Sequence, residues 1–131
     1  MIVCFDIDGV LCSQVEGDYA EAQPNAPMIA LVNRYHDEGH RIVLNTSRFM
    51  GRAKSDVFEA YRIGYEFTRL QLEGWGVRYH ELHMGKPRYH VVVDDRAAFY
   101  DPDCAKLADW LDEAAARHAD LVPAVSEQGL R

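Results

Sequence analysis

Four short apolar runs alternate with longer segments of helical periodicity along this 131-residue chain. The runs are "MIVCF" (1–5), "RIVLNTSR" (41–48, where a strand enters a polar loop), "VRYHELH" (77–83) and "YHVVVDD" (89–95). Short runs rich in Val and Ile are typical of strands in a parallel sheet. Because parallel strands need crossover connections, the pattern predicts an α/β fold, a Rossmann-like three-layer sandwich with a mainly parallel central sheet and helices on both faces.

Three segments have the spacing of amphipathic helices. In 26–38 the apolar residues recur at helical intervals after Asn25, a suitable N-cap, and Gly39 ends the pattern. Segment 50–76 is mostly helical, in two pieces if Gly64 interrupts it. In 101–119 a helix is expected to place Leu107, Trp110 and Leu111 on one face.

Length and composition indicate one domain, expected over 1–120, with a C-terminal tail at 121–131 that has no clear period and is expected to fray. A hydrophobic fraction of 48% suffices for a packed core, and a formal net charge of -7 argues against a nonspecific binder of nucleic acids or membrane surfaces. Three widely spaced cysteines form no disulfide framework. With neither a signal peptide nor a membrane span recognisable, the expected location is cytoplasmic.

Polar residues follow three of the four runs at the point where each strand ends. Asp6 and Asp8 follow the first, Thr46, Ser47 and Arg48 follow the second, and Asp94 and Asp95 end the fourth. Ligands of open α/β sheets bind at the carboxyl ends of the strands, so these side chains and Lys86 are expected at one edge. Four converging carboxylates repel one another unless a cation joins them, and Mg²⁺ is the natural candidate.

The motifs "DIDGV", "LNTSR", "GKP" and "VVVDD", in that order over residues 2–96, resemble the four motifs of the haloacid dehalogenase-like superfamily. Most members of that superfamily are Mg²⁺-dependent phosphatases. The resemblance implies that Asp6 is the nucleophile that forms an aspartyl-phosphate and that Asp8 is the general acid/base. Thr46 would hydrogen-bond the phosphoryl group, and Lys86 would neutralise its charge.

The resemblance also implies the metal ligands and the substrate-binding residues. The metal ligands would be the Asp6 carboxylate, the Asp8 backbone carbonyl, Asp95 directly and Asp94 through water. The substrate-binding residues would be Gly9, Ser47, Arg48 and Arg52. For the basic run of Arg48, Arg52 and Lys54, an exposed helix face is an equally good interpretation.

The gaps between motifs leave no room for a cap domain. The first gap, from Gly9 to Asn25, suffices only for a small hairpin flap after the first strand, and one helical stretch and one strand fill the gap between Thr46 and Lys86. An uncapped site is open to bulk water, which phosphoryl transfer must exclude. We therefore expect either a large substrate or a neighbouring subunit over the site, and a homo-oligomer is predicted.

The segments "EGDYAEAQPNAP" and "GWGVRYHELHMGKP" resemble a narrower group of small bacterial capsule or polysaccharide-biosynthesis phosphatases. That likeness implies a sugar phosphate or a related metabolite as substrate. The chain departs from the commoner pattern at Val10, where many relatives have Thr, and in Asn45-Thr46-Ser47-Arg48, where Thr-Ala-Arg is frequent.

Three alternative functions stay open on the residues alone. A phosphatase acting on nucleic-acid ends would tolerate a capless site, although the negative net charge of the chain argues against a nucleic acid as partner. A phosphorylation-controlled receiver domain also uses an acidic pair, Thr or Ser and Lys on a parallel sheet, but its motif order differs. The third alternative is a catalytically silent scaffold of the same fold.

Overall fold

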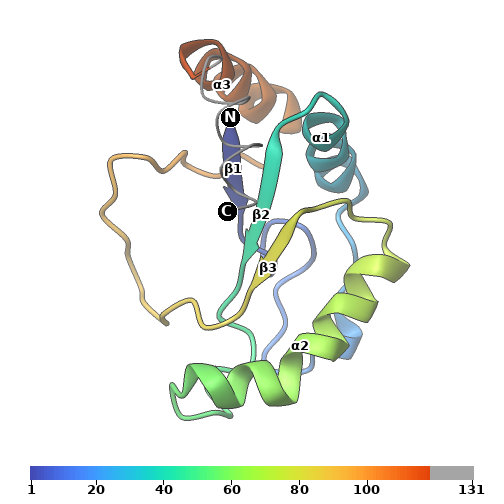
Figure 1. The fold of residues 1–131 in the computed structure, drawn as a ribbon, viewed down its shortest axis with the longest axis vertical. Coiled ribbons are helices and arrows are strands. Elements are labelled where there is room, and N and C mark those ends of the chain that lie inside the picture. The colour runs from blue at the N-terminus through green and yellow to red at the C-terminus, as the bar shows by residue number, and fades with distance from the viewer. Residues whose placement is uncertain (119–131) are drawn as a thin grey trace, which may run out of the picture.

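The structure, a computed structural model, describes residues 1–118. Its elements in chain order, shown in Figure 1, are β1 (Ile2–Phe5), the short 3₁₀ helix η1 (Tyr19–Glu21), α1 (Ala26–Asp37), β2 (Arg41–Asn45), α2 (Val57–Gly74), β3 (Glu81–His83) and α3 (Cys104–Arg117). The predicted tail, 121–131, lies outside the described residues.

The three strands form one parallel sheet in the order β1-β2-β3. Val3 pairs with Ile42 across β1 and β2, and Val43 pairs with Glu81 across β2 and β3. Helices α1 and α2 lie in the connections between these strands, as parallel pairing requires. The predicted α/β fold with a parallel, Rossmann-like sheet is confirmed.

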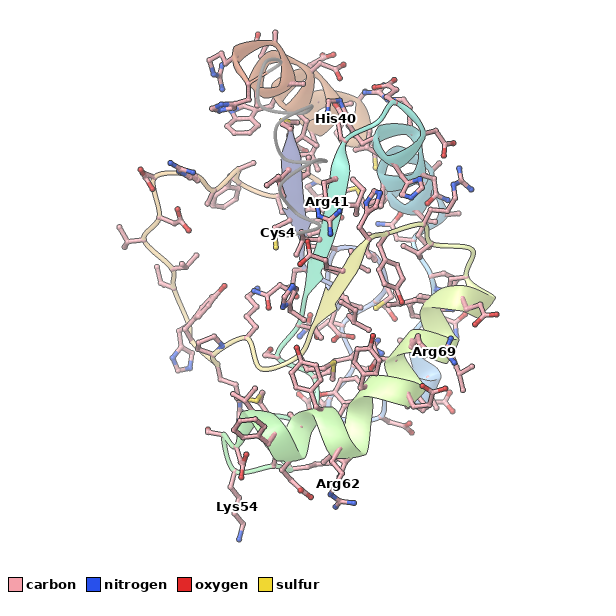
Figure 2. The ribbon with its side chains drawn as sticks, in the orientation of Figure 1. Cys4, His40, Arg41, Lys54, Arg62 and Arg69 are labelled. Atoms are coloured by element: carbon pink, nitrogen blue, oxygen red, sulfur yellow. The ribbon has the colours of Figure 1, made fainter. Side chains whose placement is uncertain are left out.

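One face of the sheet carries the main hydrophobic core. Alternate residues of β1 and β2 point into it and are buried: Val3, Phe5, Ile42 and Leu44. Helices α1 and α3 contact each other and contribute to the same core. On the opposite face of β1, Ile2 is 52% exposed and Cys4 is exposed, its side chain pointing away from the core in Figure 2. A sheet with helices on both faces would bury both sides of this strand, so the exposed side of β1 departs from the expected arrangement.

The predicted fourth strand is not formed. Residues 84–103 contain no strand or helix and run as a wide arc from β3 to α3 (Figure 1). Val91 and Val93 in this arc are 80% and 97% exposed. An apolar β-branched run favours a strand only where a neighbouring strand accepts its backbone hydrogen bonds, and within residues 1–118 none pairs with this run.

The predicted start of α1 agrees with the structure, whereas α3 begins at Cys104, three residues after the predicted start at 101. The Asn25 side chain accepts a hydrogen bond from the backbone N–H of Met28 at 3.4 Å, as an N-cap should. Leu107 and Leu111 of α3 are buried as predicted, whereas Trp110 is 44% exposed and lies on the helix flank.

Helix α2 is continuous through Gly64, so the prediction of two pieces was wrong. Gly64 is buried, and a Cβ added to it would stand 2.2 Å from Cδ2 of Phe49. The glycine therefore accommodates an aromatic ring against the helix. Glycine in this helix marks a close approach, which the pattern of apolar residues does not reveal.

The connection from β1 to α1 forms the small flap that the sequence predicts. Ser13 donates its N–H to the Gln23 carbonyl at 2.9 Å, and Cys12 and Pro24 form an antiparallel bridge at the base. The flap comprises residues 13–24, and helix η1 lies within it. Among the helices of residues 1–118, none has the length and apolar character needed to cross a membrane.

Candidate functional site

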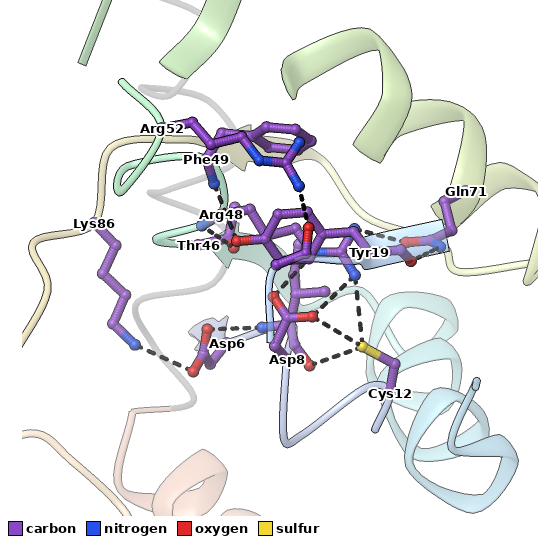
Figure 3. Close-up of polar contacts among 12 residues, drawn as sticks. Asp6, Asp8, Cys12, Tyr19, Thr46, Arg48, Phe49, Arg52, Gln71 and Lys86 are labelled. Carbon is purple, nitrogen blue, oxygen red and sulfur yellow. Dashed lines mark hydrogen bonds and ion pairs between the residues drawn. The ribbon is translucent and has the colours of Figure 1, made fainter. Parts of the chain in front are cut away.

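A cavity of about 260 Å³ opens at the carboxyl ends of β1 and β2. Its lining comes from the end of β1, the flap, the loop after β2 and the segment after β3: Asp6, Asp8, Gln14, Val15, Tyr19, Ser47, Arg48, Lys86, Pro87, Arg88 and Tyr89. The structure thus brings Asp6, Asp8 and Lys86 together at the sheet edge where the sequence predicts them (Figure 3).

Asp6 is the more accessible of the two aspartates. Its Oδ1 accepts a hydrogen bond from the backbone N–H of Ile7 at 2.8 Å, and its Oδ2 lies 3.4 Å from Nζ of Lys86. The Asp6 side chain remains 37% exposed, against 14% for Asp8. Asp6 is therefore held in one orientation while its carboxylate stays open to a ligand.

Lys86 reaches Asp6 because the segment after β3 stays hydrogen-bonded to the residue that follows β2, Thr46. Gly85 has φ +87°, which favours glycine, and the backbone N–H of Lys86 donates to the Thr46 carbonyl at 3.0 Å. Partial burial lowers the pKa of Lys86, but its hydrogen bond to Tyr89 and the charge of Asp6 outweigh this and raise the pKa above 10.5. The ammonium group therefore remains charged across the neutral range.

Asp8 forms a bidentate ion pair with Arg48. Nε of Arg48 lies 2.9 Å from Oδ2 of Asp8, and Nη2 lies 3.0 Å from Oδ1. The turn that follows brings Asp8 into reach: Gly9 has φ +85°, and Leu11 donates its N–H to the Ile7 carbonyl at 2.8 Å. Two parallel hydrogen bonds fix both the position and the plane of this carboxylate.

Arg48 is itself fixed by three further groups. Its Nη1 donates to Oε1 of Gln71 at 2.6 Å, its Nη2 lies 3.6 Å from Sγ of Cys12, and its guanidinium carbon lies 4.7 Å from the centre of the Tyr19 ring. Gln71 also donates from Nε2 to the backbone carbonyl of Tyr19 at 2.6 Å. Helix α2, the flap and the loop after β2 thus meet at one buried guanidinium (Figure 3).

The Cys12 thiol lies behind the aspartates and is buried. Its Sγ is 3.4 Å from Oδ1 of Asp8. Burial, with a contribution from the charge of Asp8, raises the pKa of the Cys12 thiol to about 12. Cys12 is therefore protonated at neutral pH and serves as a weak hydrogen-bond donor rather than as a nucleophile.

Thr46 and Gly9 flank the cavity without being part of its lining. Thr46 is buried, and its Oγ1 accepts a hydrogen bond from the backbone N–H of Arg48 at 3.0 Å. This bond shapes the loop that carries Ser47 and Arg48. Ser47 lines the cavity as expected for a substrate-binding residue.

Arg52 does not line the cavity. It donates a hydrogen bond from Nη2 to the Gly17 carbonyl, and its guanidinium carbon lies 4.9 Å from the centre of the Phe49 ring. Lys54 is exposed and points away from the site in Figure 2. Arg52 therefore does not make the expected contact with the cavity. Its hydrogen bond to Gly17 instead holds the flap against the loop after β2.

Asp94 and Asp95 do not join Asp6 and Asp8 in this structure. Both are exposed in the arc, and Asp94 accepts a hydrogen bond from the backbone N–H of Arg96 at 2.8 Å. Within residues 1–118 no group of three or more His, Cys, Asp and Glu side chains could hold a metal ion. The predicted convergence of four carboxylates fails because the fourth strand, which would carry two of them to the sheet edge, is not formed.

The residues present at the site do not fit a Mg²⁺ centre. Asp6 and Asp8 already have cationic partners, Lys86 and Arg48, and both oxygens of Asp8 accept hydrogen bonds from its partner. Magnesium sites need several oxygen ligands in octahedral geometry. In the described arrangement, side-chain cations take the place that the ion was expected to fill.

Sequence reasoning missed several residues of the cavity and its support. Gln14, Tyr19, Arg88 and Tyr89 line the cavity, and Gln71 holds Arg48 from α2. Arg88 and Tyr89 follow the "GKP" motif directly, so their position beside Lys86 was a usable signal. Gln71 had no such signal, because a polar residue on an amphipathic helix is normally solvated.

Comparison with known proteins yields a structural neighbour. No family model and no curated protein matches the chain. The crystal structure of a structural genomics target from Vibrio cholerae matches with a TM-score of 0.69 and 24% sequence identity, over 82% of this chain and 96% of that one. This likeness shows the fold alone.

Proposed function

We propose that the protein is a phosphomonoester hydrolase that works through an aspartyl-phosphate on Asp6, with Asp8 as general acid/base. The observation that supports this most directly is the pairing of an accessible carboxylate with Lys86 in a cavity at the carboxyl end of the sheet. An anionic nucleophile repels a phosphate dianion unless fixed positive charge lies beside both. Lys86 is placed to supply that charge.

The proposed reaction has two steps. An oxygen of Asp6 attacks the phosphorus, the bond to the leaving oxygen breaks with its electron pair going to that oxygen, and Asp8 gives it a proton. Water then attacks the phosphorus of the aspartyl-phosphate and loses a proton to Asp8, which releases inorganic phosphate and the Asp6 carboxylate. Oδ1 of Asp8 accepts from both Arg48 and Cys12, whereas Oδ2 accepts from Arg48 alone and keeps a second lone pair, so a proton can be held on Oδ2.

The substrate class and the cofactor are proposed from the resemblance described above. A sugar phosphate or related metabolite suits the largely polar and charged lining of the cavity. The Mg²⁺ requirement is proposed from the sequence motifs only, and no step above depends on it.

The test is hydrolysis of p-nitrophenyl phosphate by the purified chain in the presence of Mg²⁺. We expect turnover by the natural sequence, none by Asp6→Asn, and a slowed or trapped phosphoenzyme with Asp8→Asn. The control is Asp18→Asn, the same chemical change at an exposed flap aspartate whose side chain caps no helix N–H. It should retain the activity of the natural sequence.

Chemical trapping adds an independent readout. An aspartyl-phosphate on Asp6 is an acyl phosphate, so acid-quenched protein should carry a phosphate that hydroxylamine removes. Absence of turnover on every phosphomonoester tested would contradict the proposal. Stable stoichiometric phosphorylation without turnover would instead favour the receiver-like alternative.

We also propose that the protein is a homo-oligomer, because residues 1–118 form no cap domain over the site. Another subunit would help to exclude bulk water during phosphoryl transfer. Light scattering should report a mass at least twice that of one chain at assay concentration. A single-chain mass under the same conditions would contradict this.

A further inference from the structure

One cation of the cavity has no role in the proposed reaction. The lining contains two carboxylates, Asp6 and Asp8, and three cationic side chains, Lys86, Arg48 and Arg88. Lys86 pairs with Asp6 and Arg48 pairs with Asp8. Arg88, which is exposed, forms no ion pair within residues 1–118, so its positive charge is available to a ligand.

The guanidinium of Arg88 and the ammonium of Lys86 lie beside different segments of the chain. Nζ of Lys86 lies beside Asp6, at the end of β1. Nη1 of Arg88 lies over Gly51 in the loop after β2, 3.2 Å from where a Cβ on that glycine would stand. A ligand in the cavity can therefore meet one cation beside Asp6 and another, from Arg88, on the side of the cavity that faces Gly51.

We propose that Arg88 forms a subsite for a second anionic group on the substrate, a carboxylate or a second phosphate. The substrate class is then a phosphorylated sugar acid or a sugar bisphosphate rather than a neutral sugar phosphate. Arginine suits this role because its planar fork donates two parallel hydrogen bonds to a carboxylate or a phosphate. The inference rests on the proposed function for the placement of the reacting phosphate at Asp6.

The experiment compares kcat/KM for two substrates that differ in one acidic group, 6-phosphogluconate and glucose 6-phosphate. We expect the natural sequence to favour the acid by about tenfold, the scale of one charge-assisted hydrogen bond at a partly open site. Arg88→Gln should lower this ratio by about the same factor, and Arg88→Lys should restore part of it.

Two further variants sharpen the comparison. Gly51→Ala places a methyl group against the guanidinium of Arg88 and should lower the ratio without changing any charge. Arg62→Gln removes one positive charge from the exposed side of α2, where Arg62 pairs with Glu59 and points away from the core (Figure 2). It should leave the ratio unchanged, which excludes a general effect of net charge.

The outcomes separate this inference from the proposed function. A ratio that Arg88→Gln leaves unchanged, or a natural sequence without preference for the acid, would overturn the subsite. If the natural sequence turns over neither substrate, that result contradicts the proposed function instead. In that case the binding of 6-phosphogluconate, measured by calorimetry, tests the subsite. Equal affinity of the natural sequence and of Arg88→Gln for this ligand would overturn the subsite.

Discussion

Arg48 is the single residue on which most of the geometry of the site depends. Its side chain is fully buried, and its guanidinium is satisfied by Asp8, Gln71 and the Tyr19 ring. A buried charge is tolerated only when its hydrogen bonds are complete. Removal of this one side chain leaves the Asp8 carboxylate without its cationic partner and Oε1 of Gln71 without its donor.

We therefore expect Arg48→Met to destabilise the fold by about 3–5 kcal/mol, as for other broken buried ion pairs. Urea unfolding followed by circular dichroism measures the change. The matched control is Arg78→Met, which breaks the exposed pair with Asp37 and should cost about 1 kcal/mol or less. Equal losses for the two variants would show that the buried pair is no more important than an exposed one.

Gln71 is expected to act on Asp8 through Arg48. Gln71→Leu removes the acceptor of Nη1 and the donor to Tyr19. In a double-mutant cycle with Asp8→Asn, we expect a coupling free energy of about 0.5–3 kcal/mol in unfolding experiments, because both residues share one partner. Strictly additive losses would contradict the connection.

Gln71→Glu keeps the acceptor for Arg48 but sets an oxygen against the Tyr19 carbonyl, so it tests the flap contact separately.

Cys12 gives a pH-dependent prediction. Because its pKa is raised to about 12, the thiol stays protonated as pH rises through the range where ordinary cysteines ionise. At pH 8 only about one molecule in ten thousand carries the thiolate at this position. Iodoacetamide should therefore leave Cys12 unmodified in the native protein, while the exposed Cys4 reacts. Mass spectrometry of peptides locates the label, with urea-unfolded protein as the control; rapid native labelling of Cys12 would contradict the assignment.

At the scale of elements, helix α2 and the loop after β2 fit together through one glycine. Phe49 has φ +67°, an uncommon conformation for a bulky residue, and its ring lies against Gly64. The ring also contacts Tyr19 of the flap, with ring centres 4.8 Å apart. This packing orders the loop that carries Ser47 and Arg48 into the cavity.

Gly64→Ala should destabilise the protein by about 1–3 kcal/mol, the cost of overpacking a filled core. Helix propensity alone would favour alanine by about 1 kcal/mol, so the sign depends on the clash with Phe49. Gly74→Ala is the control, since nothing lies within 4 Å of a Cβ there at the end of the same helix. Thermal unfolding compares the two, and a stabilised Gly64→Ala variant would show that the ring moves freely.

The elements that the sequence predicted well are those whose signals are local. The N-cap at Asn25 and the apolar faces of α1 and α3 depend on neighbours within a few residues. The need for a glycine at position 64, inside a continuous α2, comes from the distant Phe49, so no local pattern reveals it. The strand predicted over 77–83 shrinks to Glu81–His83, and just before it the His80 ring, rather than a backbone carbonyl, accepts the N–H of Ile42.

At the scale of the whole molecule, the least predictable feature is the path of residues 84–103. Composition alone favours a strand over 89–95, but a strand exists only when another strand pairs with it. The cavity could be located from the sequence because two strand ends and the turn after β3 already define it through Asp6, Asp8 and Lys86. The second acidic pair could not, since its position depends on a pairing that only the complete fold determines.

Metal removal tests the part of the prediction that the structure does not reproduce. The sequence motifs predict that dialysis against EDTA abolishes hydrolysis of p-nitrophenyl phosphate and that Mg²⁺ restores it, whereas the ion pairs of Asp6 with Lys86 and of Asp8 with Arg48 predict activity that survives EDTA. Inorganic phosphate should still bind in EDTA, because Lys86 and Arg88 line the cavity. Turnover that is insensitive to EDTA would mean that side-chain cations suffice and that the predicted ion is not needed.

The contact between Phe49 and Gly64 has a consequence for evolution as well as for stability. A side chain at position 64 and an aromatic ring at position 49 exclude each other, because the two would share the same space. Orthologues with alanine or a larger residue at 64 should therefore carry a small residue at 49, and lineages that keep the phenylalanine should keep the glycine. Covariation at this pair would trace how the loop after β2 diversified while the sheet stayed the same.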